Sequence, residues 1–361
     1  MIVGSRVRPW PEPLAPAWWG LRALRREVFG FRFDYPIETV VGAGPRESLR
    51  YYVYSDRLFF DAMELDERGI PMHRSRTFRL FHNPAYVSWY GLVNLERSLR
   101  GLDPGGARAF LDQAAWLEAN VVRRPDGGVV WPYTVSFQEG RCVLAAPWIC
   151  AMAQGLAMST LVRAHRLMKR GRLLDLARAA TRVFEIDVKA GGVRTTEGRG
   201  ALYEEYPGYP LPRVLDGFLF SLLGLHDVAV ETGDPAAERL FSEGIEGLTD
   251  ALTSWDYRGK WSWYGTHGYL CPPHYNTLNA ALLASLARVS GEPALAHRAR
   301  AWDPPRRRSL DRVEVFVAFV VTKNLSRLRH LTWRQRTHGV GVEERERGAH
   351  IPLDATLGPG V

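Results

Sequence analysis

The chain has 361 residues, of which 46% are hydrophobic and 24% charged, a composition typical of a soluble globular protein with one large domain or two smaller ones. Lys and Arg outnumber Asp and Glu by 47 to 39, and the formal net charge of +8 favours an acidic partner, which at this point can be nucleic acid, anionic lipid or acidic polysaccharide. The cysteines Cys142, Cys150 and Cys271 are odd in number and form no CxxC pair, so neither a disulfide framework nor a tetrahedral zinc site is expected.

No targeting or membrane-spanning segment is expected from the sequence. The first 30 residues contain arginines and prolines throughout and lack the continuous apolar core of a secretion signal. The longest apolar run, residues 313–321, is about half as long as the ~20 residues that a membrane-spanning helix needs, and we interpret it as a buried strand or a short helix. Together with the unpaired cysteines, these features predict a reducing compartment, the cytoplasm.

Residues 1–80 mix strand-like pieces with polar turns. The segments RYYVYSD (50–56) and TFRLFHN (77–83) are rich in aromatic and β-branched residues, which favour strands. We therefore predict that residues 1–80 form an N-terminal extension with a small β element.

From Pro84 onwards the pattern becomes helical. Apolar residues recur at the spacing of one helix face from Phe110 to Val121. The segment 233–252 indicates a helix more clearly, because Asp234 can cap its start, Pro235 suits its first turn and apolar residues then recur on one face.

The same apolar spacing predicts a helix over residues 214–223 and a pair of helices, Asn276–Ser290 and Pro293–Trp302, separated by Gly-Glu. Three intervening segments combine glycine turns with β-branched or aromatic residues, as short β-hairpins do. They are RRPDGGVVWPYTV (123–135), KAGGVRTTEGRGALYEEY (189–206) and SWDYRGKWSWYGT (254–266).

This alternation of helix pairs and hairpins over residues 81–302 predicts a mainly α fold, an (α/α) toroid or incomplete α/α barrel, with the hairpins gathered at one rim. No fixed-period repeat is visible, so a regular solenoid is not favoured. After Trp302 the sequence becomes rich in arginine. We interpret residues 303–361 as a basic C-terminal extension, either a solvated face or a surface that holds an anionic chain, with a partly disordered tail from about residue 335.

Side chains that could perform chemistry gather in two segments, YEEYPGYPLPRVLDGF (203–218) and residues 257–276. Their tyrosines are Tyr203, Tyr206, Tyr209, Tyr257, Tyr264, Tyr269 and Tyr275. Both segments join a hairpin-like or proline-rich stretch to a helix, so in a toroid they can meet at one rim. The alternative interpretation is that these rings only pack, with their hydroxyl groups at the edge of the core.

A tyrosine needs a neighbouring cation or base to act as a base itself. With a reference pKa of about 10, a phenol is ionised about once in a thousand at pH 7, a deficit of about 4 kcal/mol. His267, His274 and Arg213 lie close in sequence to these tyrosines and could supply such a neighbour. For each histidine alone, a structural role is the simpler interpretation.

The carboxylates of the first segment leave several roles open. Glu204 and Glu205 are adjacent, so in an extended backbone they point to opposite sides and cannot form a shared catalytic pair. Asp216 stands at the start of the next helix, where capping is the simpler role. A glycoside hydrolase needs two carboxylates flanking one bond, and Glu205 with Asp216 or Asp256 keeps that alternative open.

Two motifs carry a specific resemblance to a known family. The stretch PWICAMAQGLAMSTLVRAHRL (147–167) is followed by YEEYPGYPLPRVLDGFLFSLLGLHD (203–227), and then by WYGTH and PPHYNTLNAALL. Their order and spacing resemble the catalytic domain of D-glucuronyl C5-epimerases, which convert D-glucuronic acid to L-iduronic acid within heparosan and heparan sulfate. The resemblance extends over about residues 80–302 and implies an (α/α) toroid, in agreement with the helix and hairpin pattern.

Inversion at carbon 5 of a uronate removes a proton next to a carboxylate and returns one to the other face, which requires proton-transfer groups on both sides of the ring. The resemblance implies catalytic tyrosines at Tyr206, Tyr264 and Tyr275, with Glu205 as an acidic participant. It implies substrate contacts at Trp148, Gln154, Arg213, Asp216, His267, His274 and Asn276. It implies neither a metal nor another cofactor.

The sequence departs from the animal members at several positions. Where those enzymes carry an Arg-His pair after the middle tyrosine, this chain reads Tyr264-Gly-Thr-His267, which makes His267 the candidate substitute. The tyrosine of their WYSAMAQ motif is Ile149 here, and the asparagine of their VLNGF motif is Asp216. These changes bear on substrate detail such as sulfation, while the three tyrosines are intact.

The sequence therefore predicts a metal-independent uronate C5-epimerase that acts on a heparosan-type acidic polysaccharide rather than on nucleic acid, and a homodimer by analogy with the family. Three alternatives remain from the residues alone. A polysaccharide lyase starts with the same proton abstraction, a hydrolase cleaves with two carboxylates, and a polysaccharide-binding protein performs no chemistry.

Overall fold

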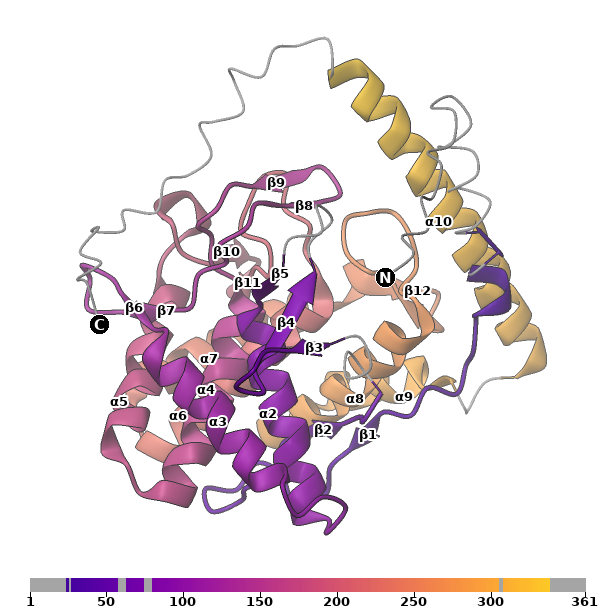
Figure 1. The fold of residues 1–361 in the computed structure, drawn as a ribbon. Coiled ribbons are helices and arrows are strands. Elements are labelled where there is room, and N and C mark those ends of the chain that lie inside the picture. The colour runs from indigo at the N-terminus through magenta and orange to yellow at the C-terminus, as the bar shows by residue number, and fades with distance from the viewer. Residues whose placement is uncertain (1–23, 26, 58–62, 75–79, 305–307, 338–361) are drawn as a thin grey trace, which may run out of the picture.

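The structure is a computed structural model that describes residues 24–25, 27–57, 63–74, 80–304 and 308–337. Within these ranges the protein is mainly helical, with short antiparallel strand pairs and no closed barrel (Figure 1). This confirms the prediction of a helical toroid with small hairpins at its rim.

The main body consists of helices that pack in sequential pairs. They are α2 (Pro84–Leu99), α3 (Gly106–Ala119), α4 (Ala151–Met168), α5 (Gly171–Ala179), α6 (Leu215–Thr232), α7 (Pro235–Ala251), α8 (Pro273–Ser290) and α9 (Pro293–Trp302). Each of α2, α4, α6 and α8 packs against the helix that follows it, and successive members of this set also pack against one another. These four helices therefore form an inner row and α3, α5, α7 and α9 an outer row, as a toroid requires.

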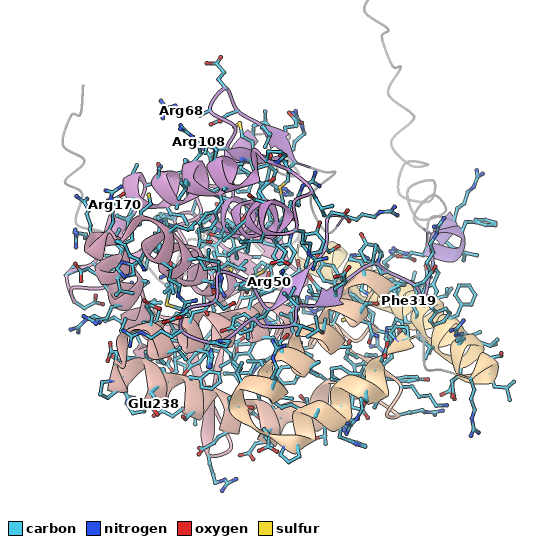
Figure 2. The ribbon with its side chains drawn as sticks, turned by 90° about the horizontal axis from the view of Figure 1, so that it is seen from below. Arg50, Arg68, Arg108, Arg170, Glu238 and Phe319 are labelled. Carbon is cyan, nitrogen blue, oxygen red and sulfur yellow. The ribbon has the colours of Figure 1, made fainter. Side chains whose placement is uncertain are left out.

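Burial follows this division into two rows. The inner helices α4 and α6 are buried on nearly all sides, whereas the outer helices α5 and α7 bury one face only, as amphipathic helices do. Figure 2 shows Arg108 of α3 and Glu238 of α7 at the periphery, pointing away from the helices.

The strands form small antiparallel sheets. The pairs are β1 (Glu38–Thr39) with β2 (Val53–Tyr54), β6 (Val122–Arg123) with β7 (Val129–Val130), β8 (Phe137–Glu139) with β9 (Cys142–Leu144), β10 (Arg194–Glu197) with β11 (Gly200–Tyr203), and β12 (Asp256–Tyr257) with β13 (Trp261–Ser262), while β3 (Glu64–Leu65), β4 (Pro71–Arg74) and β5 (Leu80–His82) form one sheet. The predicted hairpins correspond to β6–β7, β10–β11 and β12–β13. In Figure 1, β5 and β8 to β11 lie at the upper end of the helices.

Residues 51–54 fill the space between the inner helices α2 and α8. The ring of Tyr51 lies 6.3 Å from that of Trp89 in α2, and the carbonyl of Tyr52 accepts a hydrogen bond from the Ser285 hydroxyl of α8 at 3.2 Å. These residues, which the sequence assigns to an N-terminal extension, share the hydrophobic core of the helices. The domain boundary between residues 80 and 81 stays a prediction.

The inner helices α4 and α6 approach each other at two glycines. A Cβ atom added to Gly224 would lie 2.3 Å from the carbonyl oxygen of Gly155, a distance that no side chain can occupy. Gly155 belongs to the AMAQG motif and Gly224 to the helix that follows YEEYP. The presence of these two glycines in the motifs that resemble the family is therefore explained by backbone packing rather than by chemistry.

Helix α10 (Ser309–Thr337) corrects the interpretation of the apolar run 313–321. The run is neither a buried strand nor a short helix but part of the N-terminal half of this 29-residue helix. Val315 and Phe319 are buried against Trp261, whereas Val313 and Val317, on the opposite face, are 60% and 52% exposed. Figure 2 shows Phe319 on this helix. The predicted disordered tail, apart from its first residues, lies outside the described residues.

In the described part of the chain, no helix combines the length and the apolar character needed to cross a bilayer. Cys142, Cys150 and Cys271 are buried free thiols. The cytoplasmic location stays a prediction.

Asp234→Ala is expected to lower the free energy of unfolding by about 1 kcal/mol, the usual contribution of an N-cap. As predicted, the Asp234 carboxylate caps α7, where it accepts a hydrogen bond from the backbone N–H of Ala236 at 2.9 Å. Urea unfolding followed by circular dichroism measures the change. Glu246→Ala, at an exposed position of the same helix, is the control and should stay within about 0.5 kcal/mol of the parent protein. Equal stability of the two variants would contradict the capping role.

Candidate active site

A cleft of about 660 Å³, partly open to solvent, lies where the hairpins meet the inner helices. Its lining residues are His73, Phe81, Asn83, Ala85, Tyr86, Tyr133, Val135, Phe137, Trp148, Cys150, Met152, Glu205, Tyr206, Asp216, Tyr264 and Tyr275. Aromatic rings make up much of the wall, and two carboxyl groups interrupt it.

All four inner helices direct their N-terminal ends at this cleft. Tyr86 lies in the first turn of α2, Met152 in that of α4, Asp216 in that of α6 and Tyr275 in that of α8. Because a helix N-terminus carries unpaired N–H groups and a partial positive charge, four of them around one cleft favour a negatively charged ligand.

The structure places the three candidate tyrosines in this one cleft. Tyr206 follows hairpin β10–β11, Tyr264 follows hairpin β12–β13, and Tyr275 is the third residue of α8. The ring centroids of Tyr264 and Tyr275 are 5.6 Å apart, and the ring of Tyr206 is stacked on Phe137 at 5.3 Å. Three phenols that are distant in sequence are thus held together by packing.

Burial sets the protonation of these phenols. Desolvation raises the pKa of Tyr206, Tyr264 and Tyr275 well above the ordinary value of 10, and neighbouring acidic groups raise it further. Each phenol therefore keeps its proton at neutral pH and acts as a hydrogen-bond or proton donor rather than as a base.

Glu204 and Glu205 point to opposite sides, as predicted from their adjacency. Glu204 accepts a hydrogen bond from the Thr195 hydroxyl at 2.9 Å and lies 3.4 Å from Nε of Arg213, away from the cleft. Glu205 lines the cleft and is 8% exposed. Only Glu205 can take part in chemistry there.

Asp216 lies beside Glu205 in the cleft. It is 3% exposed, and it does not cap α6, since the N-cap position of that helix is Val214. The capping interpretation of Asp216 was therefore wrong. One carboxyl oxygen of each residue, Oδ1 of Asp216 and Oε2 of Glu205, is buried without a hydrogen-bond partner.

The two carboxyl groups retain protons more strongly than isolated acids. Burial raises the pKa of Asp216 to about 7, with Glu139 adding to the shift and backbone N–H groups of α6 opposing it. Burial also raises the pKa of Glu205, and the charge of Asp216 raises it further. Near neutral pH the pair therefore shares at least one proton.

Cations lie outside the cleft. Among the residues that line it in the described structure, none is a lysine or an arginine. Arg213 is engaged by Glu197 at 3.0 Å and by Glu204. Lys323 of α10 lies 3.2 Å from the ring centroid of Tyr269, which is itself stacked on Tyr264 at 5.3 Å, so this ammonium group stands behind the tyrosine wall.

Three of the remaining candidate residues belong to the cleft wall or pack behind it, namely Trp148, His267 and His274. The other two, Gln154 and Asn276, do not line the cleft. Trp148 lines the cleft and stacks on Tyr133 at 4.2 Å. His267 lies outside the lining, with its ring centroid 5.0 Å from that of Tyr264 and its Nε2 atom 2.9 Å from Oε1 of Glu139. The ring of His274 lies 4.4 Å from that of Tyr275, and burial lowers the pKa of His274 to about 4, which keeps it neutral.

Gln154 and Asn276 use their amide groups inside the protein. Gln154 accepts a hydrogen bond from the N–H of Trp131 at 3.1 Å and donates one to the carbonyl of Val129 at 3.0 Å, which fastens hairpin β6–β7 to α4. Asn276 accepts from the N–H of Ser262 at 2.8 Å and donates to the carbonyl of Trp302 at 2.9 Å. Neither lines the cleft.

Asp256, a possible carboxylate for a hydrolase, also lies elsewhere, where its Oδ1 atom accepts a hydrogen bond from Nε1 of Trp302 at 2.8 Å. The described residues contain no group of three or more His, Cys, Asp and Glu side chains that could hold a metal ion. The prediction that no cofactor is required stays a prediction.

Sequence reasoning missed His73, Tyr86 and Tyr133, all of which line the cleft. A usable signal existed for Tyr86. Tyr86 is the third residue of α2, and Tyr275 is the third residue of α8, and both helices begin with a proline. The two tyrosines therefore occupy equivalent positions on these inner helices. His73, on β4, carries no such signal.

Comparison with known proteins gives consistent matches. Residues 125–304 match the family model described as D-glucuronyl C5-epimerase C-terminus. A D-glucuronyl C5-epimerase of Caenorhabditis elegans is 32% identical over 215 residues, 54% of this chain and 34% of that protein. An uncharacterized protein of Methanocaldococcus jannaschii is 28% identical over 219 residues, 56% of this chain and 70% of that protein. The aligned region thus spans about a third of the length of the nematode protein, and α10 lies outside the family model.

Proposed function

The chain belongs, through residues 125–304, to the D-glucuronyl C5-epimerase family, and on this basis we propose that it is a uronate C5-epimerase. Its proposed substrate is D-glucuronic acid within a heparosan-type polysaccharide, and its product is L-iduronic acid in the same polymer. The observation that carries the proposal is the convergence of three phenols and two carboxyl groups in one cleft, from elements far apart in the sequence.

The reaction needs one group that accepts a proton and another that donates one. The bond between carbon 5 and its hydrogen breaks, and the electron pair moves into the adjacent carboxylate as an enediolate. A new bond to hydrogen then forms on the other face of the carbon, so no electrons are gained or lost overall. In this proposal Glu205 accepts the proton in its ionised form, because a carboxylate is a far better base than a buried neutral phenol.

The phenols serve as the donors. Their raised pKa keeps the protons of Tyr206, Tyr264 and Tyr275 available for reprotonation and for hydrogen bonds to the enediolate oxygens. The N-terminal ends of the four inner helices contribute partial positive charge to the same intermediate. The excess of basic residues outside the cleft would hold the rest of the polyanion, which makes binding sensitive to salt. A homodimer, expected from the family, also stays a proposal.

Incubation of a heparosan polymer with the protein in heavy water tests the assignment. We expect deuterium at carbon 5 and new iduronate signals in the NMR spectrum, with no shortening of the chain. Ultraviolet absorbance from an unsaturated uronate would instead indicate a lyase, and new reducing ends without unsaturation a hydrolase. Binding of the polymer without any of these changes would indicate a non-catalytic binding protein, and each of these three results would overturn the proposal.

A further inference from the structure

The cleft poses an electrostatic problem for a uronate. It already holds two buried carboxyl groups, Glu205 and Asp216, and the part of its lining that the structure describes contains no lysine or arginine. A third carboxylate, that of the sugar, would enter a poorly solvated space beside them. Helix N-termini offset part of this repulsion, but like charges at close range in a buried site disfavour one another strongly.

Two buried carboxyl oxygens without hydrogen-bond partners indicate how the cleft can accept a third carboxyl group. Oε2 of Glu205 and Oδ1 of Asp216 are buried without a hydrogen-bond partner, and a buried polar atom is normally paired. Both residues line the cleft, so a carboxylate that binds there comes close to these two carboxyl groups. A protonated carboxyl oxygen can donate a hydrogen bond to the carboxylate of a uronate, which an ionised one cannot do.

We propose that Asp216 controls the entry of the anionic substrate: in its neutral form it allows the uronate carboxylate to bind as a hydrogen-bonded partner, and in its charged form it repels that carboxylate. Asp216 is thus a specificity-determining residue whose protonation is linked to binding. The inference rests on the proposed function, since it concerns the same cleft and a uronate ligand.

Among the described residues that line the cleft around Asp216, no lysine or arginine side chain can replace this proton. The groups that titrate around the pair are Glu139 from β8, His73, Cys150, and the phenols of Tyr86, Tyr133, Tyr206, Tyr264 and Tyr275. The phenols stay neutral below about pH 10, because burial raises their pKa values. Burial lowers the pKa of His73, so it is uncharged at neutral pH as well. Glu139 only adds negative charge.

The coupling between protonation of Asp216 and ligand binding determines the direction in which the Kd changes with pH. A uronate is an anion throughout the neutral range, whereas Asp216 gains its charge as the pH rises through its pKa of about 7. If only the neutral form of Asp216 admits the ligand, the Kd should rise by up to about tenfold per pH unit above that value, or roughly 10- to 50-fold between pH 7 and pH 9.

Asp216→Asn removes the titration and leaves a permanent N–H donor of nearly the same shape. The experiment measures the Kd of a heparosan oligosaccharide by isothermal titration calorimetry between about pH 6 and pH 9 at constant ionic strength. The parent protein should show the rise in Kd and, at about pH 8, should take up nearly one proton per site in buffers of different ionisation enthalpy. In Asp216→Asn the Kd should change by less than about threefold, with almost no proton uptake.

Two controls isolate the effect. Asp112→Asn removes one exposed carboxylate of α3 and therefore tests whether a change in net charge alone alters the binding of a polyanion. An oligosaccharide whose carboxyl groups are reduced to alcohols carries no charge, so its Kd should not depend on pH in any of the proteins.

The outcomes separate this inference from the proposed function. If the oligosaccharide binds and exchanges its carbon 5 hydrogen, but the pH dependence is absent in the parent protein or persists in Asp216→Asn, the role of Asp216 is refuted while the epimerase remains. If the oligosaccharide neither binds nor exchanges at any pH, although both proteins give the same folded circular dichroism spectrum, the proposed substrate class is refuted and this inference with it.

Discussion

Replacing Tyr275 by Phe is expected to lower the rate of hydrogen exchange at carbon 5 by roughly 10²- to 10⁴-fold, the usual contribution of a general acid or base. Tyr275 lies in the first turn of α8, its pKa is raised by burial, and its ring contacts Tyr264 at 5.6 Å and His274 at 4.4 Å. Phenylalanine keeps this ring and removes only the hydroxyl group. Deuterium incorporation followed by NMR gives the rate, and binding of the oligosaccharide should persist.

Tyr209→Phe is the matched control, because Tyr209 belongs to the same YEEYPGY segment but is 54% exposed and does not line the cleft. Its exchange rate should equal that of the parent protein. A Tyr275→Phe protein that binds the polymer and still exchanges hydrogen within about threefold of the parent rate would remove Tyr275 from the proton-transfer groups.

The helices and hairpins of residues 84–302 could be predicted because their signals are local. The turn at Asp126-Gly-Gly, the cap at Asp234 and the Gly-Glu break before Pro293 each determine a boundary within a few residues. The packing of residues 51–54 between α2 and α8 could not be predicted, because it depends on contacts between Tyr52 and residues more than 200 positions away. Helix α10 was misjudged because exposed valines on one face made an amphipathic helix resemble a continuous buried run.

The candidate site also has features that could be predicted from the sequence and features that could not. The period of two along an extended chain correctly separated Glu204 from Glu205. The motif resemblance, by contrast, could not distinguish side chains that face the cleft from those that hold the motif in place. Gln154 belongs to the second kind, because its amide is fully used by the backbone of hairpin β6–β7. A motif thus marks a shared backbone arrangement as well as shared chemistry.

A buried ion pair between Arg163 and Asp227 connects α4, α6 and the N-terminal segment, and no pattern in the sequence predicted it. Arg163 is fully buried and Asp227 is 1% exposed, with Nη1 of Arg163 2.6 Å from Oδ2 of Asp227. The hydroxyl of Tyr52 also donates to Asp227, at 2.8 Å, and Nη2 of Arg163 donates to the carbonyl of Arg50 at 3.0 Å. Removing one partner would leave an uncompensated charge in the core.

Burial alone would raise the pKa of Asp227, but Arg163 holds it below its usual value of 3.8. A carboxylate with a lowered pKa in the folded state stabilises the fold at pH values above about 4. That stabilisation is lost as the pH falls from about 4 towards the folded-state pKa, so this pair should contribute to acid unfolding.

Asp227→Asn is therefore expected to lower the free energy of unfolding by about 3 to 5 kcal/mol at neutral pH, the usual effect of breaking a buried ion pair. Urea unfolding measures it, with Asp112→Asn as the control. That change breaks an exposed pair with Arg108 and should lower the free energy by no more than about 1 kcal/mol. Equal effects of the two substitutions would refute the argument. The double change Arg163→Met with Asp227→Leu should recover most of the loss, because the cost lies in the unpaired charge and not in the absence of the pair.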